Sequence, residues 1–246
     1  MLLASSLSRP HRAAVEIGIL ASLYALYEAV RGAGDASVAV ARAHTADIVA
    51  LERGLHVFDE QAVQQWSHAV PLLPALLGFA YMSLHFGATA LAVRWVYRER
   101  RHAFPLVRTT LIVSTALALV GYVLYPAAPP RLAGLGFSDT VTSHTGLNLS
   151  SNLLGSFYNP LAAVPSLHFG YALIVGGVLV TLARRRWMRV LGAAYPVFML
   201  FDIVATGNHF WFDATAGGVV VVAGWWIARA FLGASQRDVQ LHAAPA

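Results

Sequence analysis

Two polar motifs lie beside long apolar stretches of this 246-residue sequence and contain residue types that can do chemistry. The first is PSLH at 165–168, and the second is HFWFD at 209–213. Imidazole and carboxylate groups are costly at the edge of an apolar segment unless something offsets their desolvation, so they indicate a functional site.

The residue types and their spacing favour chemistry on a phosphate group. A proline and Ser166 at a helix start suit capping, and a helix start binds anions. His168 would then lie in the first helical turn, where it can act as a general acid toward a leaving oxygen. His209 and Asp213 are four residues apart and share one helix face, so the aspartate can hold one ring nitrogen while the other attacks phosphorus.

A third candidate follows a stiff, proline-rich segment. Arg131 comes directly after the sequence YPAAPP at 125–130. A guanidinium can clamp phosphate oxygens through two parallel hydrogen bonds, and we therefore expect Arg131 to bind phosphate.

The composition determines which elements must position these residues. Hydrophobic residues make up 57% of the chain and charged residues only 12%, against roughly 25% charged in soluble domains. This predicts an all-α, polytopic membrane protein. The net charge of +5 comes from arginines at the ends of apolar segments, so nucleic-acid binding is not expected. The absence of cysteine excludes disulfides, thiolate metal sites and cysteine nucleophiles.

Apolar runs of about 20 residues predict a bundle of six membrane helices. We expect them at 13–30, 72–96, 109–125, 166–182, 187–205 and 214–231. Between the first two spans, Ile48, Leu51, Leu55, Phe58 and Trp66 recur at helical spacing among charged residues, which predicts an amphipathic helix lying in the membrane interface.

The bundle is expected to divide into three parts. Residues 1–69 hold the first span and the interfacial helix, 70–232 form the catalytic membrane core, and 233–246 form a cytoplasmic tail. The long connection at 126–165 is rich in Gly, Ser, Asn and Pro, and connections of that length are usually functional or disordered.

The arginines predict the orientation. They cluster around the second and fourth connections, before the first span and after the last, and these ends should face the cytoplasm. Both termini are then cytoplasmic, and both motifs lie on the extracytoplasmic face of what we expect to be a bacterial plasma membrane.

Three segments together resemble the signature motifs of the type-2 phosphatidic acid phosphatase superfamily. They are YPAAPPR at 125–131, NPLAAVPSLH at 159–168 and GNHFWFD at 207–213. Within that superfamily the chain looks most similar to the branch of inositol phosphorylceramide synthase. The resemblance implies a six-helix core that uses no metal or other cofactor. It implies His209 as nucleophile through a phospho-histidine, Asp213 as its orienting partner and His168 as the acid.

Two cationic ligands of the wider superfamily are missing. Position 124 is Leu where a lysine is expected, and Asp202-Ile203 replaces a serine-arginine pair. The synthase-like branch resembles this chain in lacking both. We assign phosphate binding to Arg131, Ser166, Asn208 and Tyr125, and substrate contacts to Asp202 and Asn159.

Three classes of function remain open. The first is a phosphoesterase or inositol phosphotransferase that acts on a lipid phosphate, pyrophosphate or phosphodiester within the membrane, with water, inositol, another polyol or a sugar as acceptor. The second is a metal- or vanadate-binding hydrolase or peroxidase built on the same two histidines and aspartate. The third is a transporter, which would be expected to show two similar halves. The sequence leaves the oligomeric state open.

Overall fold

The computed structural model is all-α and describes residues 38–146 and 161–243, together with the single positions 18, 22 and 25. The expected first span at 13–30 lies outside the described residues except at those three positions. The interfacial helix and the remaining spans can be compared directly.

Among the described residues, four helices are long and apolar enough to cross a membrane: α4 (Leu73–Glu99), α5 (Phe104–Leu124), α9 (Arg186–Ala205) and α10, which runs over Trp211–Ala243 and is apolar to Ala234. A fifth apolar helix, α8 (Leu167–Leu182), has 16 residues and is about 24 Å long, shorter than the roughly 30 Å of a bilayer core. The five helix positions match the predicted spans, but six membrane crossings are not shown. The last helix extends about twelve residues beyond its predicted end.

Small residues allow the helices to pack closely. A Cβ atom added at Gly176 of α8 would lie 2.6 Å from the carbonyl oxygen of Gly192 on α9, so these backbones touch directly. Close approach at small residues is the usual way in which membrane helices associate, because the hydrophobic effect does not drive them together inside lipid.

The interfacial segment differs from its prediction. It forms two helices, α2 (Val38–Gly54) and α3 (Glu60–Ala69), separated by a turn in which His56 has a positive φ of 58°. Most of the periodic apolar side chains face outward; Trp66, for example, is 59% exposed. The buried face carries polar residues, including Glu52 and Glu60. We expected one amphipathic helix. The structure instead has two, and α3 buries only polar residues, whereas α2 buries Ile48 and Val49 together with Thr45 and Glu52.

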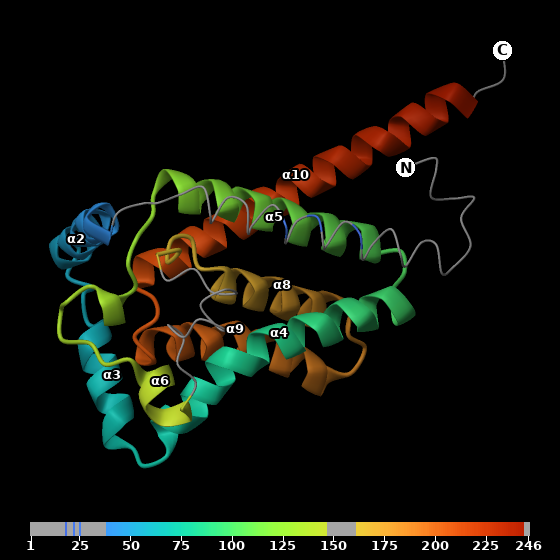
Figure 1. Ribbon diagram of the computed structural model, residues 1–246. Helices are drawn as coiled ribbons and strands as arrows, with labels where there is room; N and C mark the ends of the chain where they lie inside the picture. The colour runs from blue at the N-terminus through green and yellow to red at the C-terminus, as the bar shows by residue number, and fades with distance from the viewer. Residues whose placement is uncertain (1–17, 19–21, 23–24, 26–37, 147–160, 244–246) are drawn as a thin grey trace. The chain divides into compact units, whose positions relative to one another are not determined.

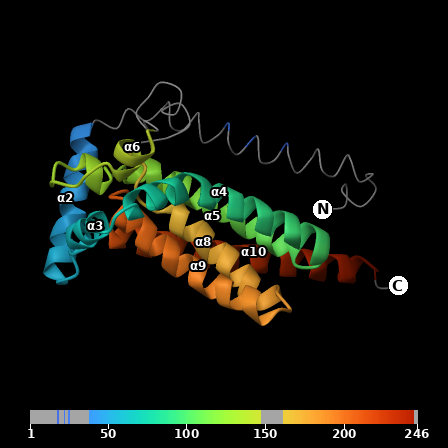
Figure 2. The same ribbon diagram turned by 90° about the horizontal axis from the view of Figure 1, so that it is seen from below.

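One end of the bundle gathers the motifs (Figure 1). The starts of α4, α8 and α10 lie at this end with the ends of α5 and α9, whereas the connections around 100–103 and 183–185 lie at the other. Figure 2 shows α2 and α3 across the same end from a second direction. A short 3-10 turn at Pro130–Leu132 and the helix α6 (Thr140–Thr145) complete the cover.

Candidate active site

His209 lies in the tight connection between α9 and α10. The backbone N–H groups of Asn208 and His209 both donate to the carbonyl oxygen of Ile203, at 3.0 and 3.1 Å. The His209 residue is only 5% exposed. The last turn of α9 therefore fixes the backbone that carries this imidazole.

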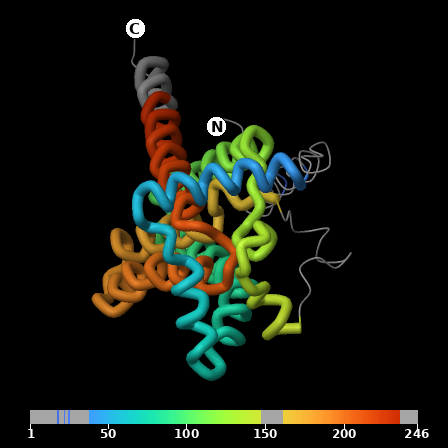
Figure 3. Tube along the Cα trace, turned by 90° about the vertical axis from the view of Figure 1, so that its left-hand side faces the viewer, coloured from blue at the N-terminus to red at the C-terminus, as the bar shows by residue number. Residues whose placement is uncertain are grey.

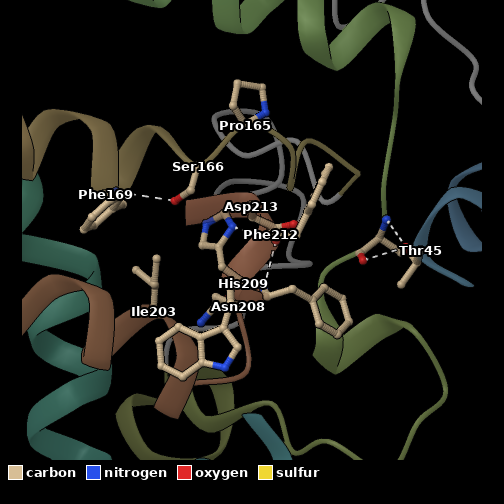
Figure 4. Close-up of polar contacts among 12 residues, drawn as sticks. Thr45, Pro165, Ser166, Phe169, Ile203, Asn208, His209, Phe212 and Asp213 are labelled. Atoms are coloured by element: carbon tan, nitrogen blue, oxygen red, sulfur yellow. Dashed lines mark hydrogen bonds and ion pairs between the residues drawn. The ribbon is translucent and has the colours of Figure 1, made fainter. Parts of the chain in front are cut away.

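Asp213 holds the His209 ring (Figure 4). The His209 Nδ1 atom lies 3.2 Å from Asp213 Oδ2, and the same oxygen accepts from the Phe210 N–H at 3.0 Å. Because a carboxylate accepts hydrogen bonds, this contact favours the tautomer with the proton on Nδ1. The Nε2 atom then keeps its lone pair and can act as a nucleophile.

His168 lies in the first turn of α8, and its ring approaches that of His209 to 5.9 Å between centroids. Two rings of α4 pack against it: Tyr81 stacks on His168 at 4.2 Å, and His85 lies 4.3 Å away at a tilt of 34°. The two histidines predicted to work together are thus neighbours, and α4 sets the plane of one of them.

The starts of α8 and α10 are joined through Ser166. This serine is the N-cap of α8, where its Oγ accepts from the Phe169 N–H at 3.4 Å, and its own N–H donates to the Asp213 carbonyl at 2.9 Å. A Cβ atom at Gly217 would lie 2.3 Å from the Ser166 carbonyl oxygen, so only glycine permits this approach. The capping role expected of Ser166 is present.

The segment that carries Arg131 contacts the stretch before Pro165 on one side and helix α2 on the other. Ala127 pairs with the strand-like stretch before Pro165 through bonds of 2.9 and 3.3 Å to Leu161 and Ala163. On the other side, the Thr45 hydroxyl of α2 donates to the Ala128 carbonyl at 2.9 Å. The pairing at Ala127 therefore brings the segment 125–131 beside the segment that leads to Ser166 and His168.

Arg131 itself reaches the histidine loop. Its Nε donates to the Asn208 Oδ1 at 2.9 Å, its backbone N–H donates to the Gly207 carbonyl at 3.0 Å, and one guanidinium nitrogen lies 3.5 Å from Asp139. Arg131 and Asn208 therefore form one unit directly before His209.

Three further residues were predicted to contact phosphate or substrate: Tyr125, Asp202 and Asn159. The Tyr125 hydroxyl donates to the His44 carbonyl of α2 at 3.1 Å, and burial, Asp47 and Asp213 raise the pKa of this tyrosine. Asp202 is fully buried, and neither carboxylate oxygen has a hydrogen-bond partner among the described residues. Asn159 lies outside the described residues.

Four residues at the site were not predicted as part of it. Tyr81 and His85 contact His168, and Glu52 and Glu60 contact the start of α10. The spacing of Tyr81 and His85, one helical turn apart within an apolar span, is the signal that identifies the first pair. The glutamates contact residues about 150 positions away, and local periodicity does not reveal such contacts.

The second class of function predicts that His168, His209 and Asp213 hold a metal ion. Within 38–146 and 161–243, no group of three or more His, Asp or Glu side chains has an arrangement that would hold a metal ion. Asp213 directs one oxygen to both His209 Nδ1 and the Phe210 N–H, and this contact orients the imidazole.

Three comparisons relate the chain to known proteins. A sequence profile of the PAP2 superfamily matches residues 46–227. Phosphoinositol dihydroceramide synthase from Bacteroides thetaiotaomicron is 24% identical over an alignment of 154 residues. The match covers 52% of this chain and 47% of that protein, so the chain spans about half the length of this relative. The crystal structure of LpxE from Aquifex aeolicus has a similar fold, with a TM-score of 0.50 at 15% identity over 69% of this chain and 93% of that one. Since the profile covers most of the sequence, and all three motifs lie within the matched residues, the chain belongs to the PAP2 superfamily.

Proposed function

We propose that this protein transfers a phosphoryl or phosphodiester group from a membrane lipid to water or to an alcohol, through a covalent intermediate on His209. The contact between His209 Nδ1 and Asp213 is the observation that carries this proposal. It leaves Nε2 as the nucleophilic atom, in a buried site beside a second histidine.

The reaction has two balanced steps. His209 Nε2 attacks phosphorus, the bond from phosphorus to the leaving oxygen breaks, and His168 donates a proton to that oxygen. In the second step a water or alcohol oxygen attacks phosphorus, the bond to Nε2 breaks, and His168 takes the proton of the attacking hydroxyl. A hydrolase and a transferase differ only in this second acceptor.

The phosphate is held between the helix start and the arginine. The first N–H groups of α8, those of Leu167 and His168, have no intrahelical acceptor and suit an anion. The Arg131–Asn208 unit lies directly before His209 and supplies the positive charge. We also assign Ser166 to this pocket, with Asp202, Tyr125 and Asn159 as further contacts to donor or acceptor.

The substrate is proposed to be a lipid phosphate, pyrophosphate or phosphodiester whose tails lie in the bilayer. The relative from Bacteroides thetaiotaomicron is named as a phosphoinositol dihydroceramide synthase, and this supports dihydroceramide as one acceptor to be tested. The arginine-rich connections lie at the bundle end opposite the site. The positive-inside rule therefore supports an extracytoplasmic site with cytoplasmic termini.

The experiment is a product analysis with purified protein. Labelled phosphatidylinositol, phosphatidic acid and polyprenyl pyrophosphate are each incubated alone, with inositol and with dihydroceramide, in the presence and absence of a chelator. The proposal predicts turnover of at least one lipid that survives chelation and is lost in His209→Ala. Turnover that requires an added metal ion, or that persists in His209→Ala, contradicts it.

A further inference from the structure

Acidic side chains from the N-terminal helices cap the start of α10. The Phe212 N–H donates to Glu52 Oε1 at 2.8 Å, and the Trp211 N–H donates to Glu60 Oε1 at 3.2 Å. The Trp211 indole donates to Asp59 at 2.7 Å. Figure 3 shows α2 crossing the beginning of α10 at this end of the bundle. The free amides of a helix start are therefore taken by carboxyl groups rather than left for a ligand.

The two glutamates form a buried pair. Glu52 is 2% exposed and Glu60 is fully buried. Each has a second oxygen, Oε2, that receives no donor from the described residues if both groups are ionised. Burial, followed by a hydrogen bond to Glu60, raises the pKa of Glu52 to about 9. The raised pKa favours the protonated form of Glu52.

The capped amides lie between the two residues that do the chemistry. Trp211 and Phe212 separate His209 from Asp213 in the chain, so a shift of this turn moves nucleophile and orienting carboxylate together. A displacement of 1 Å at a reacting group can cost about a hundredfold in rate. An uncapped α10 start would also offer a second set of amides to phosphate, in competition with the start of α8.

We propose that Glu52 and Glu60 are positioning residues of the active site: by accepting from the Phe212 and Trp211 N–H groups, they hold His209 and Asp213 in reactive geometry and reserve the α8 start for phosphate. This inference rests on the proposed function of His209. It makes the α2–α3 corner a part of the catalytic machinery.

The test compares alanine and glutamine at position 52. Glu52→Ala leaves the Phe212 N–H without its acceptor, and kcat is expected to fall at least tenfold while KM stays within about twofold. Glu52→Gln should keep kcat within about threefold, because its amide oxygen accepts the same N–H and its uncharged amino group can donate to Glu60. The exposed Glu99 at the other end of α4 provides the control, Glu99→Ala, which should match the wild type.

The pH dependence of stability distinguishes the buried Glu52–Glu60 pair from a helix cap formed by an ordinary ionised carboxylate. Glu60 on α3 and Asp213 on α10 are the acidic groups that act on Glu52. Because burial raises the folded pKa of Glu52 from its ordinary value of 4.5 to about 9, its stabilisation is complete below pH 4.5 and is lost as the pH rises toward 9. The melting temperature of the wild type should therefore fall between pH 5 and pH 9 more than that of Glu52→Gln.

The outcomes are distinguishable. Unchanged kcat in Glu52→Ala, or equal loss in the alanine and glutamine variants, overturns the positioning role. If Glu52→Ala does not fold, Glu60→Ala takes its place: this change leaves the Trp211 N–H without its acceptor, and an unchanged kcat would overturn the positioning role. His209→Ala is measured alongside: its activity would overturn the proposed function, whereas an inactive His209→Ala with a fully active Glu52→Ala overturns only the positioning role.

Discussion

Replacing Asp213 by asparagine tests the role of the carboxylate charge beside His209. Asp213 Oδ2 contacts both His209 Nδ1 and the Phe210 N–H, at 3.2 and 3.0 Å, so the nearly isosteric asparagine keeps both contacts by placing its oxygen there. An amino group in that place would meet the Phe210 donor. The change therefore keeps the tautomer with the proton on Nδ1 and removes the negative charge, which stabilises the ring when Nε2 bonds to phosphorus and the imidazole becomes positive.

The magnitude follows from the lost charge. A hydrogen bond to a charged group is worth about 1.5–3 kcal/mol, and a neutral one about 0.5–1.5 kcal/mol. For Asp213→Asn, which keeps a neutral hydrogen bond, we expect a loss of about tenfold in rate. Asp213→Ala loses the whole contact and should be slower by roughly 10- to 150-fold.

The assay is the single-turnover rate of intermediate formation, measured by rapid mixing with a labelled lipid and quenching in alkali. Substrate binding is measured separately so that a change in KM is not mistaken for a change in chemistry. An Asp213→Asn enzyme as fast as the wild type, or slower than Asp213→Ala, would contradict this role of the charge. Thermal unfolding of both variants serves as the control for folding.

The remaining predictions concern packing and phosphate binding. In Gly217→Val the new Cβ atom would lie 2.3 Å from the Ser166 carbonyl oxygen. The variant should be less stable by about 1–3 kcal/mol, which lowers Tm by roughly 2–12 °C. Gly177→Ala is the control: its Cβ atom meets nothing within 4 Å, and it should not lower Tm. An unchanged Tm in Gly217→Val would refute the close approach. Arg131→Lys loses the planar contact with Asn208 and should lower kcat/KM about 10- to 100-fold, mainly through KM; an effect confined to Tm would mean that Arg131 only anchors its loop.

Much of the helical framework was predictable because its signal is local. Long apolar runs located α4, α5, α8, α9 and α10, and most of their ends agree within a few residues. The end of α10 was misplaced because its helix continues through polar residues after the apolar run stops. The break between α2 and α3 was missed because the helical spacing of apolar residues continues across the turn, whereas the helix itself stops at Gly54 and starts again at Glu60.

The site was predictable where chemistry and motif coincide, and not where it depends on contacts between distant segments. The two histidines lie on different helices, yet each motif marks its own helix start. In contrast, Glu52 and Glu60 looked like solvated charges on an amphipathic helix, and only the fold brings them to the start of α10. His85 lies within an apolar run and belongs to no motif, and only the fold brings it to His168.

The most direct measurement is the identification of the covalent intermediate. Purified protein is incubated with the labelled lipid that it turns over, quenched in alkali to preserve a phosphoramidate, digested, and analysed by mass spectrometry. The proposed mechanism predicts a phosphoryl or phosphodiester adduct on His209, absent from His209→Ala. It predicts that His168→Ala accumulates the adduct only when the leaving group is activated, because the acid is then not needed to form the intermediate. Turnover without any adduct, or an adduct on another residue, would contradict the mechanism.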